Sequence, residues 1–136
     1  MINPLGLIAA FTAFFSTWFG HVAVRKIESI SPTIWIPSTI FIILGMACEW
    51  ISLNAFSLQI ATIFGILGIT LLFDAFELTR QQRRIMKGHA PANPDNPRHA
   101  KILKGYPAAT TMDLLKREPM GLSLVIREDS RVMEKR

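Results

Sequence analysis

The sequence predicts an all-α integral membrane protein with three transmembrane helices, the third extended into the cytoplasm, followed by a largely extended C-terminal tail. Half of the 136 residues are apolar, and no charged residue precedes Arg25. Three apolar runs are each long enough to cross a hydrocarbon core about 30 Å thick, and they cover residues 4–24, 32–53 and 55–78.

Charge is spread unevenly along the chain. Only Arg25 and Lys26, of the 15 basic residues, come before Arg80. The chain therefore divides into a three-helix transmembrane domain, residues 1–88, and a cytoplasmic tail rich in Pro and basic residues, residues 89–136. A basic segment that follows a span is explained by membrane topology and by anionic lipid headgroups, so we expect membrane lipids rather than nucleic acid as partners.

The first span is expected to begin at Pro4, because Asn3 followed by Pro is typical of a helix start. Its positive residues follow the apolar run instead of preceding it, so we expect an uncleaved span and not a signal peptide. Small residues recur at four-residue spacing in the first and third spans, where they let helices approach closely in lipid. The candidate packing residues are Thr12, Ser16, Gly20, Ala61, Gly65 and Gly68.

A short polar loop is predicted at residues 25–31, after which Ser31 and Pro32 repeat the cap-plus-proline pattern and open the second span. One long third helix is predicted within residues 54–88, because the apolar run continues into a basic end with no Pro or Gly between Arg80 and Gly88. A glycine at this point is a typical helix C-cap.

Basic residues also predict the orientation. Arg25 and Lys26 lie in the first loop, on the same side of the membrane as the basic run that starts at Arg80 after the third span. The N-terminus and the second loop carry no basic residue. By the positive-inside rule, we expect a bacterial cytoplasmic (inner) membrane protein with its N-terminus outside and its C-terminus in the cytoplasm.

The tail is predicted to be extended at first, because HAPANPDNPRH, residues 89–99, has Pro at every third position. A short helix is expected at residues 110–118, and residues 120–126 form an apolar run suited to a strand or a docking segment. The tail is too short to bury its own apolar residues, so we expect them to dock on a partner. The candidate docking residues are Leu114, Leu115, Leu122, Leu124 and Ile126.

Two segments carry a resemblance to a known family: GHVAVRKIE, residues 20–28, and FELTRQQRRIMKGHAPANP, residues 76–94. They resemble a group of small uncharacterised bacterial three-span membrane proteins, classed as a domain of unknown function. In that family Pro follows the His, where this chain has Val22, and an aromatic residue follows the Lys-Gly pair, where it has His89 and Ala90. The resemblance covers roughly residues 6–97. It implies a bacterial three-helix membrane protein, and brings no known activity or catalytic residue.

Ionisable residues gather at the predicted cytoplasmic ends of the first and third spans. The polar membrane-interface cluster consists of His21, Arg25, Asp74, Glu77 and Arg80. A contact among His21, Asp74 and Arg25 is geometrically plausible, and a His beside a carboxylate could relay protons. The favoured alternative is that these side chains reach the interface and pair with each other or with lipid headgroups, because they lie near the edge of the span.

His21 is also a candidate axial haem ligand, although b-type haem in a helix bundle usually needs two facing His and the spans contain one. The single Cys48 excludes a disulfide or a Cys-based metal site within one chain. No phosphate-binding Gly loop, nucleophile elbow or paired metal-ligand motif occurs in the sequence. We therefore expect no enzyme activity, no cofactor and no metal.

Two functions remain. The favoured one is a noncatalytic small accessory subunit of a larger respiratory, photosynthetic or transport complex, which its helices anchor and its tail helps to assemble. The alternative is an independent small transporter or proton-handling protein that works as an oligomer. Few polar groups are predicted inside the three helices to line a pore, which favours the accessory subunit.

Overall fold

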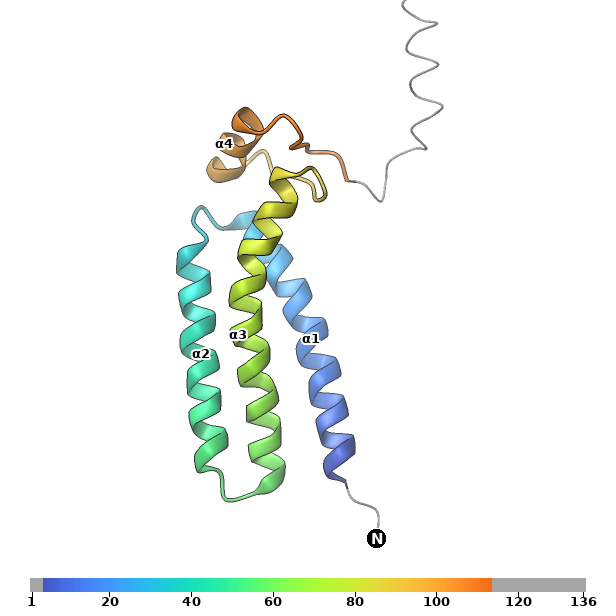
Figure 1. The fold of residues 1–136 in the computed structure, drawn as a ribbon, viewed down its shortest axis with the longest axis vertical. Coiled ribbons are helices and arrows are strands. Elements are labelled where there is room, and N and C mark those ends of the chain that lie inside the picture. The colour runs from blue at the N-terminus through green and yellow to red at the C-terminus, as the bar shows by residue number, and fades with distance from the viewer. Residues whose placement is uncertain (1–3, 114–136) are drawn as a thin grey trace, which may run out of the picture.

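The computed structural model describes residues 4–113, which form four helices and, within that range, no strand. The three long helices are α1 (Leu5–Ile30), α2 (Trp35–Asn54) and α3 (Leu58–Met86), and a short one, α4 (Pro97–Gly105), follows (Figure 1). The long helices have 26, 20 and 29 residues and are apolar enough to cross a membrane. The prediction of an all-α chain with three candidate spans is thus confirmed.

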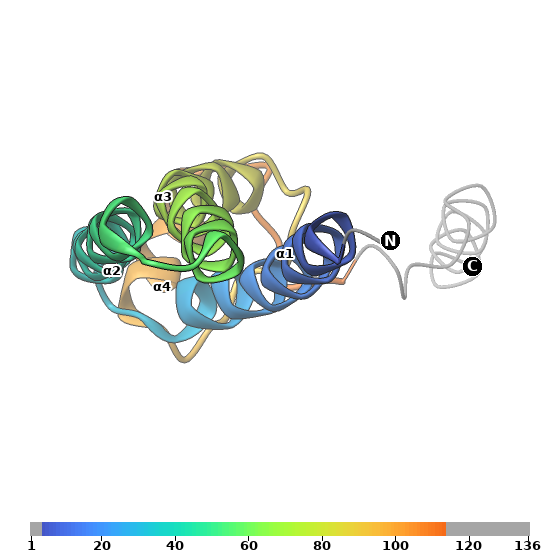
Figure 2. The same cartoon turned by 90° about the horizontal axis from the view of Figure 1, so that it is seen from below.

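The three long helices lie side by side, with α3 between α1 and α2 (Figures 1 and 2). The extensive contacts are those of α1 with α3 and of α2 with α3. The polar side chains at these contacts hydrogen-bond across them: Ser38 Oγ donates to the Ala75 carbonyl at 3.3 Å, and Ser52 Oγ donates to the Ala61 carbonyl at 2.8 Å. Helix α3 is therefore the shared support on which the other two helices pack.

The loop predicted at residues 25–31 is wrong, because α1 continues to Ile30. The segment contains no Gly or Pro, so nothing in it breaks a helix. The second helix likewise begins at Trp35 and not directly after Ser31 and Pro32. Ser31 instead ends α1 in an extended conformation, and its carbonyl accepts hydrogen bonds from the segment that precedes and opens α4.

Gly88 terminates α3 through a backbone conformation that other residues rarely adopt. Its φ is +71°, the one positive value among the described residues. The Gly88 N–H donates to the Ile85 carbonyl at 3.0 Å, and the His89 N–H donates to the Arg84 carbonyl at 2.8 Å. These two bonds form a Schellman motif, which turns the chain back toward α1.

The prediction of a largely extended tail is wrong for residues 97–105, which form α4 and fold back on the long helices. A small core joins this segment to the end of α3; it contains Ile85, Ala90, Ala92 and Ile102, with Met86, Leu103 and Ala109 packed around it. The first four residues of the helix expected at 110–118 are not helical. The rest of that helix, the apolar run at 120–126 and the docking residues Leu114, Leu115, Leu122, Leu124 and Ile126 lie outside the described residues.

Candidate functional site

A groove of about 390 Å³ opens on the face of α3 between α1 and α2. Most of its lining is apolar, and each helix contributes to it: the lining includes Phe15 and Phe19 of α1, Phe41 and Cys48 of α2, and Leu67 and Asp74 of α3. We call it the membrane groove. Because α1 and α2 both rest on α3, the groove is open on the side that would face lipid or another helix.

Asp74 is the one charged residue among the described residues that line the membrane groove. It is only 4% exposed and lies directly against Gly20 of α1, so close that a Cβ atom on that glycine would overlap the carboxylate. Its electrostatic neighbours are His21 and Glu77, and no side chain of the described residues forms a hydrogen bond or ion pair with it. A charged group within a membrane span is costly unless a partner offsets it.

The structure keeps the residues of the predicted cluster close together: His21, Arg25 and Glu77 line one small hollow. Glu77 forms ion pairs with Arg80 and with Arg84, each at 3.3 Å. Arg25 does not reach Asp74, because its Nε donates to the His21 carbonyl at 3.4 Å. Both arginines on Glu77 have half-exposed side chains, so each pair contributes little stability on its own. Of the suggested contact among His21, Asp74 and Arg25, the described residues show the electrostatic interaction of His21 with Asp74 but no ion pair of Asp74 with Arg25. The ion pair of Glu77 with Arg84 was not predicted.

The candidate packing residues lie at the contacts between helices. Ser16 and Thr70 have their hydroxyl oxygens 3.3 Å apart. Gly65 lies against Ser52, and Gly68 lies beneath the side chain of Glu49, whose carboxylate would meet a Cβ atom there at 2.5 Å. Thr12 lines the membrane groove, and the Ala61 carbonyl accepts from Ser52. Two carboxylates of the spans, Asp74 and Glu49, are therefore each seated on a glycine of a neighbouring helix.

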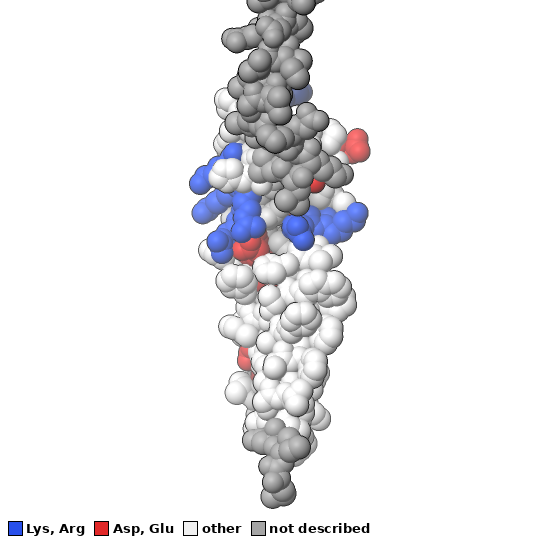
Figure 3. Space-filling model, turned by 90° about the vertical axis from the view of Figure 1, so that its right-hand side faces the viewer, with Lys and Arg blue, Asp and Glu red and all other residues white. Residues whose placement is uncertain are grey.

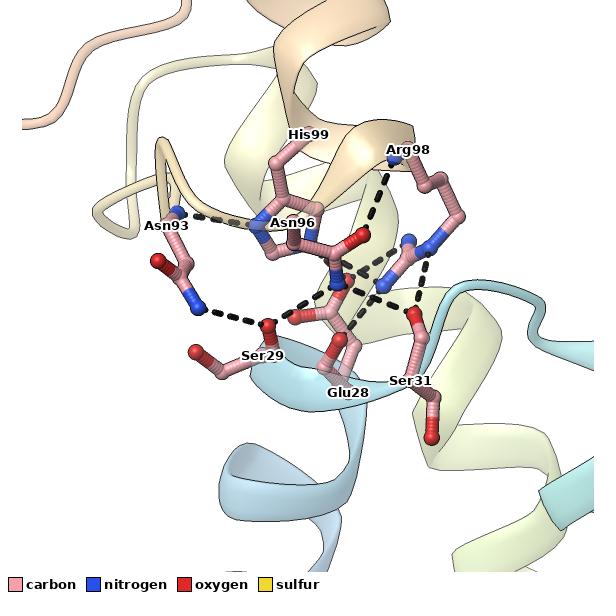
Figure 4. Close-up of polar contacts among 7 residues, drawn as sticks. All are labelled: Glu28, Ser29, Ser31, Asn93, Asn96, Arg98 and His99. Atoms are coloured by element: carbon pink, nitrogen blue, oxygen red, sulfur yellow. Dashed lines mark hydrogen bonds and ion pairs between the residues drawn. The ribbon is translucent and has the colours of Figure 1, made fainter.

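A second polar site, which the sequence analysis did not find, joins the end of α1 to the start of α4 (Figure 4). Glu28 is 1% exposed, and its Oε1 lies 2.9 Å from Arg98 Nη1 and 3.1 Å from His99 Nε2. Arg98 Nη2 also donates to the Glu28 carbonyl. We call Glu28, Arg98 and His99, together with Asn93 and Asn96, the helix latch.

The two asparagines of the helix latch cap the end of α1. Asn96 Nδ2 donates to the carbonyls of Ser29 and Ser31, both at 2.9 Å, and Asn93 Nδ2 donates to Ser29 at 3.1 Å (Figure 4). The last carbonyls of a helix have no partner within it, and a cation near them is favoured by the helix dipole. The helix latch supplies both the donors and the positive charge.

Hydrogen bonding fixes the tautomer of His99, which is fully buried. The Asn93 N–H donates to His99 Nδ1 at 2.9 Å, so Nδ1 is an acceptor and the proton lies on Nε2. Nε2 then donates to Glu28. Because Nε2 and Arg98 Nη2 both carry hydrogens that point to Glu28, their separation of 3.0 Å is a close approach of two donors rather than a hydrogen bond. His99 acts here as a buried structural donor.

The structure offers no metal site within residues 4–113, where no three His, Cys, Asp or Glu residues are grouped to hold an ion. His21 is exposed and has no second histidine recorded beside it as a hydrogen-bond or ionic partner among the described residues.

A comparison with known protein families matches residues 3–96 of the chain to a domain of unknown function, DUF4491. No curated protein and no solved structure matches the chain. The match ends at Asn96, so it includes Glu28, Asn93 and Asn96 of the helix latch but not Arg98 or His99.

Proposed function

This chain belongs to the DUF4491 family, and we propose that it is a noncatalytic accessory subunit of a larger bacterial membrane complex, respiratory, photosynthetic or transport. In this proposal the three helices anchor the assembly through the membrane groove, and the segment from residue 89 onward contacts partners at the cytoplasmic face.

The observation that carries the proposal is the position of Asp74. Its carboxylate is 4% exposed, lines an open groove between membrane-spanning helices and has no hydrogen-bond or ion-pair partner among the described residues. A buried carboxylate in lipid is stabilised when another group pairs with it. Lipid chains carry no hydrogen-bond donor, whereas a transmembrane helix with a Lys, Arg, His, Ser or Thr side chain does.

The shape of the membrane groove also suits a helix. Gly20, Ala23 and Ser16 line it, and small residues of this kind let a neighbouring helix approach closely. We assign the groove to a helix of a different protein. A symmetric contact between two copies of this chain at the groove would bring two Asp74 carboxylates together, and like charges repel strongly where water is absent.

The alternative, an independent oligomeric transporter or proton-handling protein, has one observation in its favour. Glu49 and Asp74 are two acidic residues within the spans, and each lies over a glycine of another helix. Within residues 4–113 no chain of hydrogen bonds joins them; Ser16 and Thr70 contact each other instead. The accessory subunit therefore remains the better supported proposal.

For location, we propose the bacterial cytoplasmic membrane, with the N-terminus outside and the C-terminus in the cytoplasm. The support is the position of the basic residues, which gather at one end of the long helices, whereas the rest of the described surface in view carries no Lys or Arg (Figure 3). A reporter fused after Arg136 should be active in the cytoplasm, and one fused at Met1 should be active outside. Periplasmic exposure of the C-terminus would overturn this orientation.

Purification in a mild detergent tests the proposed function. The tagged full-length chain should be recovered with unrelated membrane proteins in a fixed stoichiometric ratio, as determined by mass spectrometry. Asp74→Ala should weaken that association while the chain is still inserted in the membrane. Recovery of a pure homo-oligomer would support the transporter instead.

A further inference from the structure

A hollow of about 680 Å³ lies where the basic ends of α1 and α3 meet the segment after α3. Its cationic lining is formed by Arg25 and Lys26 of α1 and Arg84 of α3, with His89 beside them. A smaller hollow of about 280 Å³ shares Arg25 and Arg84 with it and continues toward Glu77. We call the two together the basic hollow.

The charges around the basic hollow do not cancel. Glu28 also lines it, but its carboxylate is already held by Arg98 and His99. Glu77 is shared between Arg84 and Arg80, which leaves one positive charge in excess. Neither Arg25 nor Lys26 has an ion pair with a carboxylate of the described residues. The remaining carboxylate in the described lining is Asp113, whose single negative charge is smaller than the positive charge of Arg25 and Lys26 together. The net positive charge of the basic hollow therefore favours an anion.

The position of the basic hollow identifies the source of that anion. Lys and Arg side chains form a belt at one end of the long helices, and the described surface below the belt shows no Lys or Arg (Figure 3). The helices themselves are apolar enough to cross a membrane. Arg25 comes two residues after Ala23, the last α1 residue that lines the membrane groove, which at about 1.5 Å per residue is about 3 Å further along the helix. This is the level at which the headgroups of a phospholipid leaflet lie.

We propose that the basic hollow is a binding site for the phosphate-bearing headgroup of an anionic glycerophospholipid. Arg25 and Arg84 approach it from two different helices, and a guanidinium can hold a phosphate through two parallel hydrogen bonds. Lys26 adds a third positive charge. Because the site is built from two helices and the loop between α3 and α4, it selects a bound lipid rather than attracting the leaflet as a whole.

Lipid titration tests this site. The full-length protein in a nonionic detergent is titrated with phosphatidylglycerol or with phosphatidylcholine of the same acyl chains, and native mass spectrometry counts the bound lipids. Wild type should bind phosphatidylglycerol at least tenfold more tightly. Replacing two charges with Arg25→Gln and Lys26→Gln should reduce that affinity by about 25-fold, at about fivefold per basic residue, and should weaken phosphatidylcholine binding less, because the choline cation already offsets the phosphate.

The matched control is Arg83→Gln with Lys87→Gln, which removes two charges from the end of α3 outside the basic hollow and should change the affinity less than twofold. Lys26→Gln alone keeps the test valid if the double variant does not fold, because this side chain is exposed and forms no ion pair among the described residues. Equal binding of the two lipids by wild type would overturn the proposal. So would an equal loss in the control variant, or displacement of the lipid by millimolar inorganic phosphate.

Discussion

Glu28 in the last turn of α1 and Arg98 in the first turn of α4 form an ion pair across 70 positions of the sequence. The pair is 2.9 Å long and almost buried, with 1% of the Glu28 side chain and 12% of the Arg98 side chain exposed. Because the same guanidinium also donates to the Glu28 carbonyl, Arg98 ties both the backbone and the side chain of α1 to α4. The segment after α3 is thereby fixed at the end of the long helices.

Glu28→Gln should destabilise the protein by about 3–5 kcal/mol, because it leaves Arg98 buried without a counter-charge. Thermal unfolding in detergent measures the loss, and limited proteolysis between residues 89 and 113 should become faster. Lys101→Gln is the control, since it removes an exposed charge from α4 outside the helix latch. A Glu28 variant as stable as the control would show that the ion pair does not hold α4 in place.

Asn96→Ala should cost about 1–3 kcal/mol. The Asn96 side chain accepts from the Arg98 N–H as the N-cap of α4 and donates to two carbonyls at the end of α1. Asp95→Ala serves as the control, because that exposed side chain has no recorded partner in the described part of the chain. Equal melting temperatures for the two variants would contradict the capping role.

Gly20→Ala should disturb the packing of α1 on α3, because the new methyl group would overlap the Asp74 carboxylate. Overpacking of this kind costs about 1–3 kcal/mol. Gly6→Ala, in the same helix, meets nothing within 4 Å and should be neutral or slightly stabilising. Unfolding in detergent distinguishes the two, and a Gly20 variant as stable as wild type would mean that α1 does not lie this close to Asp74.

Gly88→Ala should cost about 1–3 kcal/mol, since the φ of +71° strains any residue with a Cβ atom and the Ala108 carbonyl occupies the space beside it. Gly105→Ala, at the end of α4, meets no atom within 4 Å and should not destabilise. Thermal unfolding of the two variants checks the Schellman motif, and the Gly88 variant should have the lower melting temperature. A Gly88 variant as stable as the Gly105 variant would contradict the motif.

Length and apolarity were enough to predict the three long helices, because the backbone N–H and C=O groups of a segment in lipid must hydrogen-bond within that segment. Helix ends were harder to place. The pattern at Ser31 and Pro32 looked like a helix start, but the Ser31 carbonyl is bound by Asn96 and Arg98, a contact that only the folded chain creates.

A local signal for α4 was present in the sequence. Asn96 followed by Pro97 repeats the helix start expected at Asn3 and Pro4, but three prolines at regular spacing favoured an extended reading. Glu28, which pairs with Arg98 of α4, lay in a segment predicted as a loop. The buried ion pair between Glu28 and Arg98 could therefore not be anticipated. The contact of Asp74 with Gly20 likewise depends on how α1 crosses α3, which sequence periodicity does not determine.

Crosslinking from Cys48 tests the central proposal most directly, because this single cysteine lines the membrane groove. A thiol-linked photocrosslinker at Cys48 in native membranes should capture a transmembrane segment of one different protein that carries a hydrogen-bond donor, and Asp74→Ala should lower the yield severalfold. The same probe moved to the opposite face of α2, in Cys48→Ala with Ile43→Cys, should not capture that segment. Capture of lipid alone, of a second copy of this chain, or of the same segment from both positions would contradict the proposed role of the groove.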